Sequence, residues 1–122
     1  MVLPGLTAGG AERVANIIAG VLDRRGWKIS IICFSDAESP SYYPNPDSVD
    51  VIRLNLPPRQ QGVLIGQISA VRRALRLRRA LDAVSPDVVI SFLTRTNILA
   101  LLATIGRETP VIVSERNNPD AQ

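Results

Sequence analysis

The chain has 122 residues, of which 46% are hydrophobic, and a net charge of +3 at pH 7. This length and composition predict one globular domain with a buried core and exclude wholesale disorder. The sequence contains no histidine, which excludes a histidine metal site, triad or proton shuttle within these residues. No apolar run approaches the ~20 residues that span a bilayer, and the first residues lack a signal-peptide pattern.

The first predicted element is the end of a central strand at residues 1–3, which are largely apolar and precede a glycine turn. So short a run suggests that the numbering starts inside this strand and that the chain is a fragment of a longer protein. A helix is predicted after the turn, and Gly26 stands where its C-terminal cap belongs. Its apolar face has helical spacing and consists of Val14, Ile17, Ile18, Val21 and Leu22.

A pair of glycines, Gly9 and Gly10, leads directly into this helix. Glycine lets a ligand approach the main chain, and a helix start presents N–H groups and the positive end of the helix dipole. The combination suits a phosphate or another anion. A tight strand-to-helix turn without a ligand explains the same glycines, and both readings stay open. Glu12, in the first helical turn, is explained by the dipole alone.

The rest of the chain alternates between predicted strands and helices. Apolar runs predict strands at 28–34, 49–54, 88–93 and 111–113, and helical patterns predict helices at 64–84 and 97–105. Ser85-Pro86 is expected to end the longer helix, and Thr94 or Thr96 is expected to cap the shorter one. Cys33 lies within an apolar run, which predicts a buried thiol compatible with a reducing compartment.

This alternation predicts an α/β fold with a Rossmann-like, doubly wound parallel sheet. Ligands of such sheets bind at the carboxyl ends of the strands. Three polar segments are expected to converge there: the Gly9-Gly10 turn, residues 94–97 and residues 114–118. The alternative, that each of these loops is polar only because it meets water, remains open.

The predicted helix at 64–84 carries a run of arginines. At ~100° per residue, one arc holds Arg72, Arg73, Arg76 and Arg79, and another, apolar arc holds Leu64, Ile68, Val71 and Leu75. Arg78 falls on the apolar side and is expected to extend its guanidinium out of it. A solvated helix face explains the arginines, whereas an anionic membrane surface is the sharper hypothesis. Nucleic acid is not expected, because the chain has only 4% aromatic residues and no recognition motif.

Several motifs of well-known sites are absent. Gly5, Gly9 and Gly10 do not form the G-x-G-x-x-G fingerprint of dinucleotide sites, and there is no P-loop, C-x-x-C, H-E-x-x-H or G-x-S-x-G. Asp36 does follow the second strand, where a ribose-binding acid would lie. A stand-alone nucleotide- or dinucleotide-binding module is therefore the alternative function.

Three segments together resemble a known family. They are Gly9-Gly10-Ala11-Glu12-Arg13-Val14, Pro86-Asp87-Val88-Val89-Ile90-Ser91 and Pro110-Val111-Ile112-Val113-Ser114-Glu115-Arg116-Asn117-Asn118-Pro119. The chain resembles the N-terminal half of the glycosyltransferase group 1 family, also called family 4, in bacterial members that build polysaccharides and glycans. The resemblance covers nearly all of the 122 residues.

The resemblance implies a GT-B architecture, in which two Rossmann-like domains enclose the active site. It implies a retaining transfer from a nucleotide-sugar donor to a glycan or lipid-linked acceptor, with no cofactor and no bound metal. Residues 1–122 would form the N-terminal, acceptor-side domain. The C-terminal domain, which holds most of the nucleotide site, would be missing, so this chain alone is expected to be inactive. Lipid-linked acceptors imply a cytoplasmic protein at the inner face of the membrane.

The resemblance and the charge chemistry suggest binding residues, while the catalytic residues stay unassigned. Gly9, Gly10 and Ala11 would present N–H donors to the departing diphosphate, with Arg13 as a cationic partner. Glu115 would accept hydrogen bonds from sugar hydroxyls, and Arg116 would be a second cation. Some members of the family carry a histidine near the position of Asn117. This chain has no histidine, so the role of that residue does not carry over. The residues expected along the acceptor cleft are Thr94, Arg95, Asn97, Glu115, Arg116 and Asn117.

Overall fold

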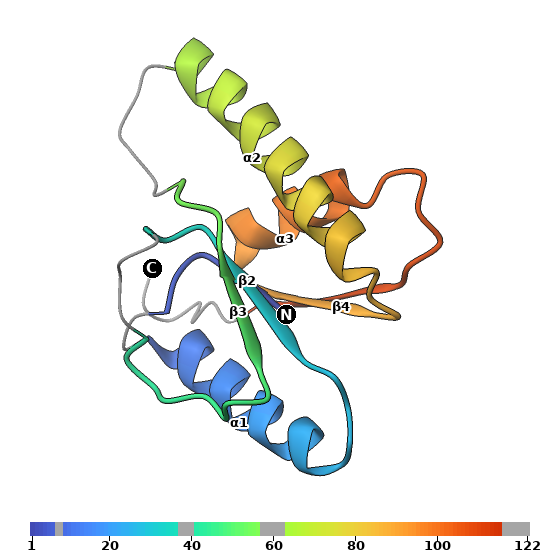
Figure 1. Ribbon diagram of the computed structural model, residues 1–122. Helices are drawn as coiled ribbons and strands as arrows, with labels where there is room; N and C mark the ends of the chain where they lie inside the picture. The colour runs from blue at the N-terminus through green and yellow to red at the C-terminus, as the bar shows by residue number, and fades with distance from the viewer. Residues whose placement is uncertain (7–8, 37–40, 57–62, 116–122) are drawn as a thin grey trace.

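In the computed structural model, five parallel strands form one sheet in the order β3-β2-β1-β4-β5 (Figure 1). The structure describes residues 1–6, 9–36, 41–56 and 63–115, and only the backbone of residues 63–67. The strands are β1 (Val2–Leu3), β2 (Ser30–Cys33), β3 (Asp50–Arg53), β4 (Val89–Phe92) and β5 (Val111–Ser114). The helices are α1 (Gly10–Arg24), α2 (Val63–Val84) and α3 (Thr94–Ala103).

The predicted parallel sheet is confirmed, and so is the central place of the first strand. Val2 lies opposite Ile32 of β2 on one side and Ser91 of β4 on the other. The sheet therefore grows outward from β1 in both directions, first to β2 and β3 and then to β4 and β5. This change of direction puts the point where ligands of such sheets bind between β1 and β4.

Helices cover both faces of the sheet (Figure 1). Successive residues of β1 point to opposite faces, so Val2 joins a core cluster with Leu77 and Leu81 of α2, whereas Leu3 joins a second cluster with Ala15 and other residues of α1. α3 lies on the same face as α2 and contributes Leu99, Ala100 and Ala103 to the first cluster. The doubly wound arrangement predicted from the alternation is thus confirmed.

The predicted ends of α1 and α2 are also confirmed. Gly26 follows α1 with a φ of 88°, and the backbone N–H groups of Gly26 and Trp27 donate to the carbonyls of Asp23 and Leu22, both at 3.0 Å. This pair of hydrogen bonds is a Schellman motif, which needs a left-handed residue at the glycine position. Ser85 ends α2 with a φ of 52° and donates its hydroxyl to the carbonyl of Asp82.

α3 begins earlier than the sequence predicts, and neither predicted threonine caps it. The N-cap is Leu93, with a φ of 75° and no side-chain hydrogen bond to the helix, and Thr94 is already the first helical residue. Thr96 is buried within the first turn. Because the helix begins at Thr94, this residue has a helical backbone and does not occupy the N-cap position; its hydroxyl donates to a side chain on the neighbouring segment, as described below.

The apolar arc identified on α2 from the sequence is not the face that packs on the sheet. Ile68, Val71 and Leu75 are 62%, 61% and 54% exposed, whereas Leu77 and Leu81 are buried in the core. The side chain of Leu64 lies outside the described residues. α2 has apolar residues on more than one side, and the alanines at 70, 74 and 80 also pack against the core, so periodicity alone does not tell which side is buried.

Arg78 does not have to leave a buried apolar face, because the arc on which it was placed is the exposed one. Its guanidinium donates to the carbonyls of Ala103 and Ile105 at 3.1 and 2.6 Å. These carbonyls stand at the C-terminal end of α3, where cations are favoured by the helix dipole. Arg78 therefore joins α2 to the end of α3.

Candidate functional site

The candidate site lies at the carboxyl ends of the three neighbouring strands β1, β4 and β5. The Gly9-Gly10 turn follows β1, Thr94 follows β4, and Glu115 follows β5. Because the strands are parallel and adjacent, their carboxyl ends share one edge of the sheet. The structure joins Thr94, Asn97 and Glu115 by direct hydrogen bonds. It places the glycine turn after the strand next to them.

Neither glycine of the turn is required by the backbone conformation. Gly9 is the N-cap of α1 with an extended conformation (φ −71°, ψ 165°), which other residues adopt readily, and Gly10 is the first residue of the helix. A Cβ on Gly10 would meet nothing within 4 Å, and Gly10 is exposed. A Cβ on Gly9 would meet the carboxylate of the buried Glu12. The fold therefore explains a small residue at position 9 but not at position 10, which leaves open space for a ligand there.

The start of α1 supplies the predicted N–H donors. The first hydrogen bond of the helix runs from the N–H of Arg13 to the carbonyl of Gly9 at 3.1 Å, and Gly9, the N-cap, has no side chain that could cap the helix. The N–H groups of Gly10 and Ala11 therefore precede the hydrogen-bonded part of the helix. The methyl group of Ala11 is packed in the core, so Ala11 can offer a ligand only its backbone, whereas Arg13 is exposed.

A polar cluster joins the ends of β4, α3 and β5. Glu115 accepts hydrogen bonds from the hydroxyl of Thr94 (2.6 Å) and from the amide of Asn97 (3.0 Å). These two hydrogen bonds, the one from Thr94 first, lower the pKa of the Glu115 carboxyl although the side chain is exposed. Asn97 also donates to the carbonyl of Ser114 at 3.3 Å and is only 3% exposed. Glu115 is thus held as a carboxylate in a defined position.

Ser91 completes this cluster and was missed by the sequence analysis. Its hydroxyl is fully buried in β4 and donates to Asn97 Oδ1 at 2.6 Å. A serine inside a run of valine, isoleucine and phenylalanine was the available signal, because a polar group at a core position needs a hydrogen-bond partner. Leu93, between Ser91 and Thr94, has a left-handed backbone, and such conformations are concentrated at functional sites.

The other predicted cleft residues are only partly placed. Arg95 is exposed at the start of α3 and lies near enough to Arg73 of α2 to affect its ionisation. Burial, and then the charge of Arg95, lower the pKa of the Arg73 guanidinium. Arg116 and Asn117 lie outside the described residues. Asp36, the candidate ribose-binding acid, is exposed beyond the end of β2.

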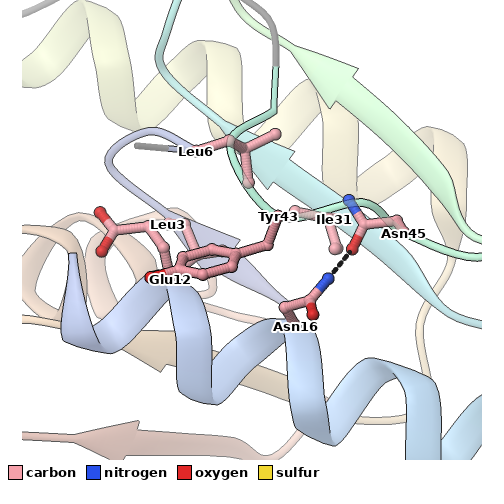
Figure 2. A pocket seen from close by; sticks show the side chains of 7 residues that line it. All are labelled: Leu3, Leu6, Glu12, Asn16, Ile31, Tyr43 and Asn45. Atoms are coloured by element: carbon pink, nitrogen blue, oxygen red, sulfur yellow. Dashed lines mark hydrogen bonds between the residues drawn. The ribbon is translucent and has the colours of Figure 1, made fainter. Parts of the chain in front are cut away.

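A small pocket lies between α1, β1 and the segment 41–48 (Figure 2). Its cavity volume of about 10 Å³ is close to that of one water position and too small for a sugar. Glu12 and Tyr43 line it with apolar residues, and Asn16 donates to Asn45 Oδ1 at one end. A wider groove of about 450 Å³ runs along α1 toward Arg24, and none of the predicted site residues lines it.

The four arginines predicted to face a membrane have different surroundings. Arg72 and Arg79 are exposed. Arg76 is half-buried and donates to the carbonyl of Leu54 at 3.3 Å, and Arg73 lies 5.9 Å from the ring centre of Phe34. Among the residues that the structure describes, no helix is both long and apolar enough to cross a membrane.

Comparison with known proteins gives the same family as the sequence motifs. The model of a family described as "Glycosyl transferase 4-like domain" matches residues 9–122. A relative from Campylobacter jejuni subsp. jejuni serotype O:2 is 36% identical over 118 residues, which cover 96% of this chain and 32% of the relative. Its name is GalNAc-alpha-(1->4)-GalNAc-alpha-(1->3)-diNAcBac-PP-undecaprenol alpha-1,4-N-acetyl-D-galactosaminyltransferase. The chain thus spans about a third of the length of this curated relative.

Proposed function

Because the chain belongs to the glycosyl transferase 4-like family, we propose that it is the N-terminal half of a retaining glycosyltransferase that uses a nucleotide-sugar donor. The observation that carries the proposal is the open space at Gly10. Among the described residues, no atom beyond the neighbouring backbone lies within 4 Å of where its Cβ would stand, and its φ does not require glycine. The dinucleotide alternative has only the exposed Asp36 in its favour.

The start of α1 is the proposed place of the donor diphosphate. As the bond between the sugar and the diphosphate breaks, negative charge develops on the leaving group. The N–H groups of Gly10 and Ala11 and the positive end of the helix dipole would stabilise that charge without reorganising, with Arg13 as an exposed cation nearby. Such stabilisation requires no bound metal. The second, C-terminal domain would supply the rest of the nucleotide site, and this chain alone would not transfer sugar.

The acceptor is proposed to be a glycan linked to a lipid diphosphate. The name of the relative describes transfer of N-acetylgalactosamine to a glycan on an undecaprenyl diphosphate, which supports this acceptor class here. A lipid-linked acceptor requires an enzyme that works at a membrane surface. The protein would then be cytoplasmic and bound peripherally at the inner face of that membrane.

α2 offers a surface for this attachment. It consists of exposed apolar side chains together with two of the four arginines, rather than of all four arginines. An exposed apolar ridge of Ile68, Val71 and Leu75 runs along α2, and Arg72 and Arg79 are exposed on the same helix. Apolar side chains entering the headgroup region beside cations that bind anionic lipids are typical of interfacial helices. α3 packs on the same face of the sheet, and further exposed apolar residues lie on it and just after it: Ile98, Leu101, Leu102 and Ile105.

The donor site is tested with Gly10→Val in the full-length protein, with Gly20→Val as the matched control on the same helix. A Cβ at Gly20 makes only an ordinary contact, 3.5 Å from Arg24 Nη1. Calorimetric titration with a panel of UDP- and GDP-sugars should show affinity falling about tenfold or more for Gly10→Val and unchanged for the control. Equal donor affinity in both folded variants would show that the turn does not contact the donor. Titration with NAD tests the dinucleotide alternative.

The membrane surface is tested by co-sedimentation of the full-length protein with anionic and with neutral liposomes. Changing both Arg72 and Arg79 to Gln should weaken binding to anionic liposomes by about thirtyfold, because each basic residue contributes about 1 kcal/mol near such a surface. Binding should also fall as salt rises. Val71→Ser should weaken binding at every salt concentration. If neither change alters binding, these side chains contact another part of the protein or only water.

A further inference from the structure

The hydrogen bonds around Asn97 leave its amide only one orientation. The buried hydroxyl of Ser91 donates to Oδ1, so Nδ2 points toward Glu115 Oε1 and the carbonyl of Ser114. The reverse orientation would set Oδ1 against two acceptors and lose both bonds. Because Ser91 and Asn97 are 0% and 3% exposed, water cannot easily replace these contacts. The buried pair of Ser91 and Asn97 therefore determines that the Nδ2 group of Asn97 faces the carboxylate of Glu115.

Glu115 keeps hydrogen-bonding capacity for a ligand. An ionised carboxylate has about four lone-pair positions and no donor. Thr94 uses one position on Oε2 and Asn97 uses one on Oε1. The side chain is exposed, so a ligand can reach the carboxylate. Its natural ligands are hydrogen-bond donors such as hydroxyl groups.

Charge separates the diphosphate of the donor from the sugar of the acceptor at this edge of the sheet. The start of α1, after β1, favours anions, whereas the carboxylate of Glu115, after β5, repels them. β4 lies between these two strands. The diphosphate of the donor therefore belongs at the glycine turn, and an uncharged sugar with its hydroxyls belongs at Glu115.

Building on the proposed transferase function, we propose that Glu115 binds hydroxyl groups of the acceptor sugar and that Asn97, held by Ser91, is the positioning residue that aims it. The competing explanation is that the cluster only ties α3 to β4 and β5. The two differ in their kinetic consequences. A purely structural cluster affects folding stability, whereas a positioned acceptor-binding carboxylate affects the KM for the acceptor and leaves donor affinity unchanged.

The test uses the full-length protein, a panel of UDP- and GDP-sugars that includes UDP-N-acetylgalactosamine, and polyprenyl-diphosphate-linked N-acetylgalactosamine oligosaccharides. Glu115→Gln keeps the side-chain shape and removes the charge, and Glu108→Gln is the matched control at an exposed glutamate outside the cluster. Glu115→Gln should raise the acceptor KM about tenfold or more, with the donor dissociation constant within about twofold of wild type. The control should change neither value.

Asn97→Ala should raise the acceptor KM in the same direction but less. Thr94→Val, at an exposed position, tests the same anchoring if Asn97→Ala does not fold. An active wild type in which Glu115→Gln leaves the acceptor KM unchanged, or weakens donor binding instead, overturns this inference alone. A wild type that neither binds nor transfers any sugar of the panel overturns the proposed function, and this inference with it.

Discussion

The hydrogen bond between Ser91 and Asn97 makes a quantitative prediction about folding. Asn97→Ala removes three side-chain hydrogen bonds, at 2.6, 3.0 and 3.3 Å. Its largest cost comes from Ser91, whose hydroxyl is fully buried and loses its acceptor. A stranded buried polar group costs about 1–3 kcal/mol, whereas the exposed Glu115 can bind water instead. We expect Asn97→Ala to lower the free energy of unfolding by about 2–3 kcal/mol.

A double-mutant cycle separates this hydrogen bond from general packing effects. Ser91→Ala alone strands Asn97 Oδ1 and should cost about 1–2 kcal/mol. Combining it with Asn97→Ala removes both partners, so the double mutant should be about 1–2 kcal/mol more stable than the sum of the single changes predicts. Urea unfolding of the four proteins, with equal denaturant slopes, measures these free energies. Strict additivity to within about 0.5 kcal/mol would refute the argument that the two side chains form one buried unit.

Three further expectations concern α2 and the anchoring of Glu115. Leu77→Ala should lower the free energy of unfolding by about 3 kcal/mol, and Leu75→Ala by less than about 1 kcal/mol, because Leu77 is buried and Leu75 is 54% exposed; equal losses in urea unfolding would contradict the assigned face. Arg78→Met keeps the aliphatic stem but removes the donors to the end of α3, so thermal and urea unfolding should show a loss of about 1–2 kcal/mol. Thr94→Val removes the main cause of the lowered pKa of Glu115, so carbon-detected NMR titration should show that pKa rising. In wild type the stabilisation from this carboxylate is present above the pKa of an unfolded glutamate and is lost as the pH falls through the lowered pKa; the stability of Thr94→Val should therefore depend less on pH in that acidic range.

The order of the elements and the layout of the sheet were determined by local sequence. Alternating apolar runs and helical patterns were sufficient to predict parallel strands with helices on both faces, because neither arrangement depends on fine packing. The central strand was predicted from the short apolar run before the glycine turn. The cap at Gly26 was predicted too. A Schellman cap depends only on residues next to the helix end, and it favours glycine at the residue with a positive φ.

Only the tertiary structure decided which side of α2 is buried, where α3 begins and which residues hold Glu115. Leu75 and Leu77 are equally apolar, and the position of the sheet and of α3 decides between them. Thr94 has the chemistry of a helix cap, but it is the first helical residue, and its hydroxyl donates to a carboxylate 21 residues along the chain. Asn97 and Glu115 were predicted at this edge from polarity. Their link to Ser91 depends on adjacent strands and a packed helix, and such contacts between distant residues leave no periodic trace in a single sequence.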